Sequence, residues 1–453
     1  MIFHKSVLAD LLTPVSAYMR VSADSDRAFL LESVEGGERV ARYSFIGVDP
    51  YRSFEGTLEE FRQIFPQLQP PHPDLPPFAG GAVGVFAYDM VRELERIPHE
   101  GTEPPRSAVR MDLYSTVLAF DHVKHQIIIM SHDSAEKVDE IEQRLRQVSS
   151  SESRVLSTEK VAAIKSDSSR RNLLDSGRVA RSSFSRDEFC DAVEKAKEYI
   201  RAGDIFQVVL SQRFEEDFRG DPFSVYRALR YINPSPYMFF LKQGETCVAG
   251  SSPEMLVRVE GRELEYRPIA GTRRRGRDAE HERRLEVELL NDEKEKAEHL
   301  MLVDLGRNDL GRVSDFGEVR VENLMFLEKY SHVMHMVSAL KGRLREDRDR
   351  FDALAACFPA GTVTGAPKIR AMEIIQELER SNRGIYAGAI GYIDYSGNLD
   401  SCIAIRTIVF ENGKAQIQAG AGIVADSVPE LENLECHNKA QVLFKALELG
   451  REL

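Results

Sequence analysis

Two pairs of glutamates have the spacing that would let them bind a divalent cation. Glu295 and Glu298 lie in "NDEKEKAEHLMLVDLGRND", and Glu432 and Glu435 lie in "PELENLECHNKA". The i,i+3 spacing on a predicted helix puts both carboxylates of a pair on one face. Mg²⁺ takes one or two protein carboxylates together with water and an anionic substrate. The pairs therefore predict a magnesium site between two helices, although a single such pair is more often an exposed helix face.

The stretch "FPAGTVTGAPKIRAMEIIQELE" predicts an anion site where a loop enters a helix. Apolar residues recur every three positions from Ile369 to Leu378, as on the buried face of a helix. Free N–H groups and the positive dipole end attract anions there, and Thr362, Thr364 and Lys368 add donors. The glycine spacing does not match a nucleotide-binding P-loop. The alternative is an ordinary glycine-rich loop before a helix.

Four other groups could take part in chemistry, and each has a structural alternative. Arg406 lies in the apolar run "CIAIRTIVF", a predicted strand, and its partner would be an anionic ligand or a structural carboxylate. The "AGAG" at 419–422 allows close approach of a ligand or forms a tight turn. His335 could be a general base or a packed core histidine. Glu254 could be a general acid or an acid in the first turn of a helix.

Composition excludes several classes of function. The net charge of −13 over 453 residues argues against nucleic acid and acidic membranes as partners. The five cysteines form no C-x-x-C pair, which argues against a zinc site or disulfide framework and favours a reducing cytosol. No long apolar run or hydrophobic signal core is present. We therefore expect a soluble, untargeted, cytoplasmic protein with one large or two ordinary domains.

A serine-rich stretch divides the chain near one third of its length. Residues 149–185 have weak apolar periodicity and are predicted to be a flexible linker. Residues 1–148 contain short strand-like runs and a proline-rich turn, so they are predicted to be rich in sheet. In residues 186–453, helices alternate with long strands without a regular βαβ rhythm. This pattern favours a mixed α+β fold.

Several long motifs carry a resemblance to a known family. They are "PIAGTRRRG", "EHLMLVDLGRNDLGRV", "SHVMHMVS", "GTVTGAPKIRAMEII", "GAIGYIDYSGNLDSCIAIRT" and "AGAGIVADSVPELENLECHNKA". The sequence resembles the chorismate-utilising enzymes over nearly all of residues 186–453, and "LLES" and "RYSFIG" extend the resemblance before the linker. Within the family it is most similar to the large subunits, component I, of anthranilate synthases.

The resemblance implies a fold and a division of labour. Antiparallel β-sheets would form a sandwich with helices packed outside. Residues 186–453 would be the chorismate-binding catalytic region, and residues 1–148 would be regulatory and would contact a glutaminase. The anion would be chorismate, a dicarboxylate that is held together with Mg²⁺.

The family pattern also implies roles for individual residues. Glu298 and Glu435 would be the metal ligands, with Glu295 and Glu432 close by and acting partly through water. The residues implied to bind substrate are Gly271, Thr272, Tyr386, Arg406, Gly420, Ala421, Gly422 and Lys439. The residues implied in catalysis are Glu254, His335 and Thr362, and Thr362 would also contact a substrate carboxylate.

Two positions distinguish the branches of the family by their nucleophile. Gln207 stands where isochorismate and salicylate synthases have a lysine that activates water, and an amide cannot act as that base. Ala270 stands where aminodeoxychorismate synthases usually have a lysine that attacks the ring. Ammonia is the remaining nucleophile. The resemblance therefore implies a Mg²⁺-dependent lyase of tryptophan biosynthesis that makes anthranilate and pyruvate from chorismate and ammonia.

The resemblance further implies a partner and an inhibitor. No cysteine lies in a G-x-C-x-G setting, so ammonia would come from a separate glutamine amidotransferase subunit, anthranilate synthase component II. L-Tryptophan would inhibit by binding to Leu31, Glu32, Ser33, Asn233, Pro234, Ser235, Tyr237, Met238 and Cys402, where the alternative is ordinary sheet packing.

Two rival functions remain open. One is aminodeoxychorismate synthase component I of the folate pathway, which product identification would distinguish. The other is a non-catalytic regulator that binds tryptophan or chorismate. The second function would require a degraded acidic pair or a missing Glu254, and the sequence retains all of them.

Overall fold

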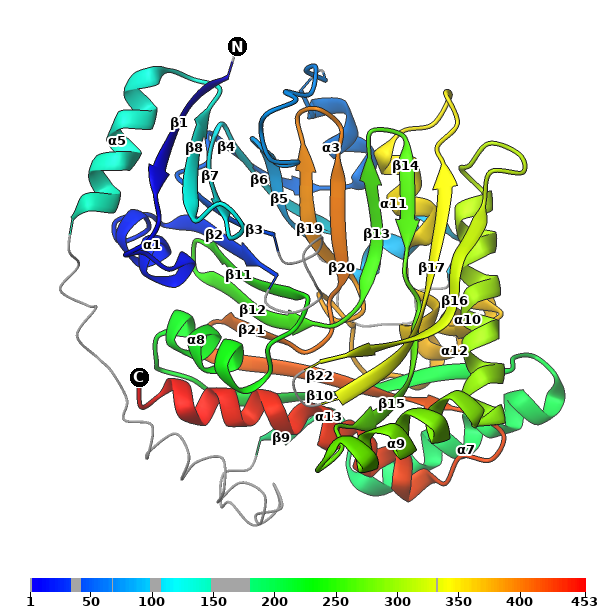
Figure 1. The fold of residues 1–453 in the computed structure, drawn as a ribbon. Helices are drawn as coiled ribbons and strands as arrows, with labels where there is room; N and C mark the ends of the chain where they lie inside the picture. The colour runs from blue at the N-terminus through cyan, green and yellow to red at the C-terminus, as the bar shows by residue number, and fades with distance from the viewer. Residues whose placement is uncertain (1, 34–41, 67, 98–106, 148–179, 331–332) are drawn as a thin grey trace.

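Two large antiparallel sheets face each other and carry helices on their outer sides (Figure 1). The computed structural model describes residues 2–33, 42–66, 68–97, 107–147, 180–330 and 333–453. Within these residues one sheet has 12 strands and the other has 10. We call them the first and the second sheet. This architecture confirms the expected α+β sandwich.

The first sheet contains strands from both ends of the chain. In spatial order they are β1 (Phe3–Leu8), β8 (Gln126–Ser131), β7 (Thr116–Asp121), β3 (Tyr43–Val48), β2 (Arg27–Glu32), β11 (Tyr237–Gln243), β12 (Thr246–Ser252), β21 (Thr407–Glu411), β22 (Lys414–Ile423), β10 (Gln207–Asp217) and β18 (Gly365–Ala366). The short β9 (Arg181–Ser182) also pairs with β10.

The second sheet is ordered in the same interleaved way. Its strands are β15 (Ile269–Arg274), β17 (Val333–Arg343), β14 (Glu263–Tyr266), β13 (Met255–Glu260), β20 (Leu399–Ile403), β19 (Ala389–Asp394), β5 (Gly81–Phe86), β6 (Val109–Tyr114) and β4 (Arg52–Gly56). The strand β16 (Arg320–Lys329) pairs with β17.

Both sheets join the segments that precede and follow the predicted linker. In the first sheet β2 pairs with β11, so that Leu30 lies opposite Phe240. In the second sheet β5 pairs with β19, so that Val85 lies opposite Ile390. Most of the predicted linker lies outside the described residues. The segments 1–148 and 186–453 therefore share their sheets and their hydrophobic core.

Helices cover the outer face of each sheet. On the first sheet lie α1 (Pro14–Val21), α5 (Ala135–Arg146), α8 (Pro222–Ile232) and α13 (Pro429–Gly450). On the second sheet lie α3 (Leu58–Ile64), α10 (Glu293–Gly311) and α11 (Arg350–Cys357), while α7 (Arg186–Ala202) and α12 (Lys368–Leu378) pack around β10. The remaining α-helices of the described residues are α4 (Val91–Leu94) and α9 (Ala279–Asn291). Across the described residues, no helix has the length and apolar character needed to span a membrane.

The core between the sheets is apolar and aromatic. Phe29 and Phe239 come from the first sheet and Ile390 from the second, and all three are buried in one cluster. Gly250 lies beside Phe239, and a Cβ on this glycine would come within 2.2 Å of the ring. Glycine is therefore required at this position for the ring to lie flat on the sheet.

Among the short segments at which the chain crosses between the sheets, two lie side by side. Pro253 and Glu254 connect β12 to β13, and residues 404–406 connect β20 to β21. The Ile403 amide donates to the Glu254 carbonyl at 3.0 Å, and the Ser251 amide donates to the Arg406 carbonyl at 3.1 Å. These bonds fix the two connections to each other.

The crossings correct two sequence interpretations. The run "CIAIRTIVF" is not one strand, because β20 ends at Ile403 and Arg406 has a left-handed backbone with φ of 52°. Glu254 is not in the first turn of a helix, because it lies between two strands. Neither the change of sheet nor the backbone conformation has a signature in hydrophobic periodicity.

Candidate active site

The two glutamate pairs lie near the starts of α10 and α13, as predicted. At α10, the side chain of Asp292 caps the helix by accepting from the amides of Lys294 and Glu295. Burial raises the pKa of Glu298 and of Glu432, and Lys439 of α13 partly offsets the rise at Glu298, as Lys294 of α10 does at Glu432. Each helix therefore lies within electrostatic range of the other, and the fold brings the two pairs together.

The electrostatic environment of the pairs fits a divalent cation. Burial and then the neighbouring Glu295 raise the pKa of Glu298. The pKa of Glu432 is likewise raised, by burial first, while Glu435 also adds to the shift. Raised pKa values mean that nearby cations do not compensate the carboxylates fully. No group of three or more His, Cys, Asp or Glu within the described ranges could hold a metal, so a cation here would also need water and substrate oxygens.

Local contacts position the first pair differently. Arg273 donates to Glu295 at 3.0 Å, while the side chain of Gln207 lies near Glu298 and offsets part of the rise in the pKa of that carboxyl. Gly271, in a bulge of β15 with φ of 60°, lets the backbone lie close to Glu295, since a Cβ there would be 3.0 Å from its Oε2. The Glu298 carboxylate is thus less neutralised by the protein than that of Glu295, which suits the predicted role of a metal ligand.

The strand β22 presents its glycine-rich backbone to Tyr386. Ala421 and Gly422 are in ladder positions opposite β10, so the alternative of a tight turn for "AGAG" is wrong. A Cβ on Gly420 would come within 2.7 Å of the Tyr386 hydroxyl. Lys439 donates to the Gly420 carbonyl at 3.0 Å and pairs with Glu435 at 2.5 Å. The predicted substrate-binding backbone, Tyr386 and the second acidic pair therefore lie together.

Arg406 lies next to the same groups and lacks a carboxylate partner. Burial lowers its pKa, and Tyr386 and Glu435 only partly offset that shift. Among the described residues, no ion pair of the Arg406 guanidinium is found, although the salt bridges of many other arginines are present. A partly buried cation without an anion is costly. The site therefore fits an anionic ligand better than it fits the alternative of a structural ion pair.

Glu254 is buried and protonated at neutral pH. Burial raises the pKa of its carboxyl from 4.5 to about 8, and the hydroxyl of Thr362 counteracts the shift. The Thr362 Oγ1 is itself buried and makes no hydrogen bond of good geometry, although it lies close to this carboxyl. A carboxylic acid that keeps its proton at neutral pH can act as a general acid.

His335 lies opposite Thr272 across β17 and β15. Its Nδ1 is 3.0 Å from Thr272 Oγ1 and 3.4 Å from the Gly271 carbonyl oxygen. Because a carbonyl only accepts, we assign the proton to Nδ1, which leaves Nε2 as the basic nitrogen. Burial lowers the pKa of His335, and Arg406 lowers it further. The side chain is only partly buried, so it differs from a packed core histidine.

The predicted anion site at the start of α12 loses two of its three donors. Lys368 pairs with the buried Asp309 at 2.7 Å, and the Thr364 hydroxyl donates to the Ala360 carbonyl at 2.8 Å. Lys368 therefore fastens α12 to α10. Only Thr362 remains available, and it faces Glu254 rather than the dipole end of the helix.

Sequence analysis missed two residues that organise the site. Arg273 bridges Glu288, Asp292 and Glu295, and Asp309 is the partner of Lys368. Three consecutive arginines beside a glycine, close in sequence to an acidic helix, were a signal for the first network. The Asp309–Lys368 pair spans 59 positions, and no local pattern identifies it.

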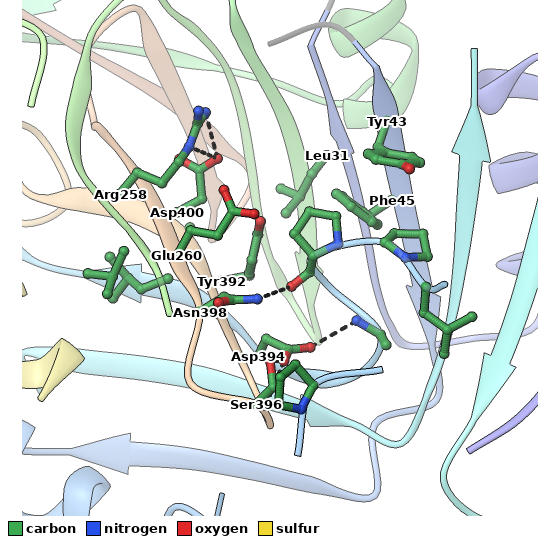
Figure 2. A pocket seen from close by; sticks show the side chains of 18 of the residues that line it. Leu31, Tyr43, Phe45, Arg258, Glu260, Tyr392, Asp394, Ser396, Asn398 and Asp400 are labelled. Carbon is green, nitrogen blue, oxygen red and sulfur yellow. Dashed lines mark hydrogen bonds and ion pairs between the residues drawn. The ribbon is translucent and has the colours of Figure 1, made fainter. Parts of the chain in front are cut away.

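Six of the nine residues predicted to bind tryptophan line a separate cavity of about 940 Å³ between the two sheets (Figure 2). Leu31, Tyr43 and Phe45 reach it from the first sheet, and Arg258 and Asp400 lie on the second. Of the predicted residues, Leu31, Glu32, Ser33, Tyr237, Met238 and Cys402 line the cavity, whereas Asn233, Pro234 and Ser235 are not in its wall.

The polar groups of this cavity are unevenly satisfied. The Glu32 carboxylate accepts hydrogen bonds from Tyr226 at 2.5 Å and Arg230 at 2.9 Å. Ser33 Oγ and Arg42 Nε are buried without a hydrogen-bond partner. The cavity therefore offers donors for an anionic group, while the Glu32 side chain joins β2 to α8.

Comparisons with known proteins agree with this geometry. Residues 26–445 match the family model described as chorismate binding enzyme. "Anthranilate synthase component 1" of Acetivibrio thermocellus is 49% identical, with 99% of this chain and 95% of the relative covered. The crystal structure of anthranilate synthase component I from Streptococcus pneumoniae superposes with a TM-score of 0.79 at 36% identity, covering 96% and 98% of the two chains. The isochorismate synthase MenF of Escherichia coli, at 20% identity, shares the fold with a TM-score of 0.74 over 99% and 95%.

We expect Glu254 to make the stability of the protein depend on pH. Between about 4.5 and about 8 the native protein keeps this proton while the unfolded chain loses it, so the contribution of Glu254 to stability falls as pH rises. Glu254→Gln cannot ionise. In urea unfolding, the free energy of unfolding of Glu254→Gln minus that of the wild type should increase by about 1.4 kcal/mol per pH unit across that window. The exposed Glu280→Gln is the control, and a pH-independent difference for Glu254→Gln would contradict the assignment.

Proposed function

Because this chain belongs to the family of chorismate-binding enzymes, we propose that it converts chorismate and ammonia to anthranilate and pyruvate. It would thus be a component I of anthranilate synthase, with tryptophan as its feedback inhibitor. The observation that carries the proposal is the position of Arg406 within electrostatic range of His335 and Glu435. A dicarboxylate with a reactive ring requires three features: a cation without a carboxylate partner, a neutral histidine and an acidic pair, which here lies on α13.

The choice of nucleophile rests on two side chains. Gln207 lies near Glu298, at the edge of the site, and its amide cannot activate water. Ala270 is buried on β15 and offers no amine for attack on the ring. Ammonia therefore acts as the nucleophile, and the similarity to anthranilate synthase component 1 relatives supports the same branch.

Addition of ammonia is the first step. Arg406, Tyr386 and the backbone of residues 420–422 hold the substrate carboxylates. Ammonia forms a bond to C2 of the ring, the double bonds shift, and the C4 hydroxyl leaves as water after taking the proton of Glu254. Aminodeoxyisochorismate results, and a proton from the ammonium group restores the acid.

Elimination is the second step. His335 is neutral and holds its proton on Nδ1, so Nε2 removes the proton from C2. The C–O bond to the enolpyruvyl group breaks, and this group leaves as pyruvate after protonation. Aromatisation of the ring drives the reaction to anthranilate.

Glu298 and Glu435 would hold Mg²⁺, with Glu295 and Glu432 behind them. When bound, the ion supplies positive charge that fixes and polarises the ring carboxylate. The raised pKa of Glu298 supports this role, since it reflects a carboxylate that the protein itself does not neutralise.

Metal dependence is tested on the two proposed ligands. Glu298→Gln and Glu435→Gln should lower Mg²⁺-dependent turnover by roughly 100-fold or more and weaken Mn²⁺ binding measured by EPR, because a ligand is lost. Circular dichroism should show an intact fold. Glu293→Gln, in the first turn of α10 with a side chain 87% exposed, is the matched control. Wild-type turnover of both ligand variants at limiting Mg²⁺ would exclude this role.

The nucleophile and the partner are tested by product analysis. The purified chain with chorismate, Mg²⁺ and an ammonium salt should form anthranilate, which is detected by its fluorescence. With glutamine it should form none until a glutamine amidotransferase subunit is added, because none of the chain's cysteines has a glutaminase setting. Aminodeoxychorismate as the product would instead favour the folate-pathway enzyme. Glutamine-dependent turnover by the chain alone would refute the need for a partner.

We propose that tryptophan binds in the cavity between the sheets. Ser33 and Arg42 supply unsatisfied donors for its carboxylate, and Tyr43, Phe45 and Met238 supply apolar surface for its indole ring. Glu32 is committed to Tyr226 and Arg230, so the ammonium group must use backbone carbonyls of the cavity wall instead.

The cavity has two contacts with the substrate-binding side. Cys402 lies in its wall on β20, the strand that ends just before Arg406. Asn233, close in sequence to the wall, donates to Ser251 Oγ at 2.9 Å, and the Ser251 amide bonds to the Arg406 carbonyl. A ligand that shifts either segment is thus connected to the crossing that carries Arg406. By reciprocity, chorismate must then weaken tryptophan binding by the same factor.

Regulation is tested at Ser33. Ser33→Leu should fill the donor end of the cavity and weaken inhibition by tryptophan at least about tenfold, while uninhibited turnover stays within about twofold. The chain contains no tryptophan, so the ligand can be followed by its own fluorescence. Ser6→Leu, at an exposed position of β1, is the control. No binding at millimolar tryptophan, or unchanged inhibition in Ser33→Leu, would overturn the proposal.

A further inference from the structure

Three side chains form a row across neighbouring strands of the second sheet, with His335 at its centre. On β17, His335 lies opposite Thr272 of β15 and opposite Glu328 of β16. Directly opposite residues of antiparallel strands point to the same face. Thr272 contacts the Nδ1 side of the imidazole at 3.0 Å. Thr272 does not contact the side of the imidazole that faces β16, so other groups must hold that side.

Tyr330 supplies that support. Its ring meets the imidazole of His335 edge-on, with centroids 5.6 Å apart and planes at 60°. Its hydroxyl donates to Glu328 Oε2 at 2.7 Å. The tyrosine is buried, and its hydroxyl is fixed by the carboxylate that stands opposite the histidine. Aromatic pairs of this geometry restrict ring rotation.

Polar contacts fix Tyr330 in place more than apolar packing does. The other oxygen of Glu328 is ion-paired with Arg267, and both side chains are largely buried. Behind them lies a small cavity of about 20 Å³ that Arg267, Glu328 and Tyr330 share with Pro236 and Tyr237. A gap on that side means that apolar contacts alone do not fix Tyr330 there. The Glu328 carboxylate is thus one of the contacts that fix the hydroxyl of Tyr330.

We propose that Glu328 and Tyr330 are positioning residues that hold the imidazole of His335 in the orientation for removal of the ring proton. The inference rests on the proposed function, because it assumes that His335 acts on substrate. Arg267 anchors Glu328, Glu328 holds the hydroxyl of Tyr330, and the tyrosine ring restrains the histidine. Thr272 and Gly271 fix the opposite edge, so that Nε2 has one direction in which to act.

The test removes each contact in turn. Glu328→Ala and Tyr330→Leu should lower kcat by about 10- to 100-fold and change KM for chorismate by less than about threefold, because the carboxylate-binding residues are untouched. Glu328→Gln still accepts from the tyrosine hydroxyl and should recover most of the lost kcat. Tyr330→Phe keeps the ring but loses this hydrogen bond, so it should lose about as much kcat as Glu328→Ala. An equal loss in Glu328→Gln and Glu328→Ala would contradict positioning.

A double-mutant cycle separates positioning from a general loss of structure. In a His335→Ala background, Glu328→Ala should have no further effect on kcat, because nothing remains to be positioned. Glu322→Ala removes a glutamate from the same strand, 3.5 Å from Lys341 and away from His335, and should match the wild type. Additive losses in the double variant, or an equal loss in Glu322→Ala, would overturn the proposal.

A second readout does not depend on the proposed reaction. The imidazole proton resonances of His335, assigned by their disappearance in His335→Ala, should shift and broaden in Glu328→Ala and stay unchanged in Glu322→Ala. If the wild type makes no anthranilate but these resonances respond, the proposed function fails and the positioning stands. If the wild type is active and the resonances do not respond, the positioning fails alone.

Discussion

The paired crossings between the two sheets are the constraint on which the site depends. One crossing carries Glu254 and the other carries Arg406, and backbone hydrogen bonds of 3.0 and 3.1 Å join them. Because each crossing is continuous with strands of both sheets, a shift of either sheet would move both residues. Arg406 keeps a left-handed backbone there, which is uncommon for a large side chain and must be stabilised by its surroundings. The acid and the cation are thus held at a fixed separation.

The charges of the site are not neutralised by the protein's own groups, which makes the site complementary to a charged ligand. Glu298 and Glu432 have raised pKa values, so neighbouring cations do not fully compensate their carboxylates. Arg406, in turn, lacks a carboxylate partner. Simple pairing of these groups would have stabilised the empty protein. Keeping them apart costs stability and leaves room for a cation and an anion together. Glu254 follows the same rule, since its burial keeps a proton available at neutral pH.

The interleaved sheets explain how one cavity can join distant parts of the chain. The cavity lies between Leu31 and Phe45 of the first sheet and Asp400 of the second, and β20 runs from its wall to the crossing at Arg406. Phe29 and Phe239 are buried in one cluster beside the cavity, which joins the packed core to the cavity wall. One strand therefore joins the cavity to the crossing that carries Arg406, although the two share no residues.

The sequence by itself determined the elements and the chemical types. Apolar periodicity from Ile369 to Leu378 identified α12, and the i,i+3 spacing put each glutamate pair on one helix face. It could not determine that Arg406 leaves its strand, that Lys368 is paired with Asp309, or that Glu32 faces Tyr226. Those facts depend on contacts between residues tens to hundreds of positions apart, which leave no local pattern. Tertiary structure also set the pKa of Glu254, because burial is a property of the folded chain rather than of a residue type.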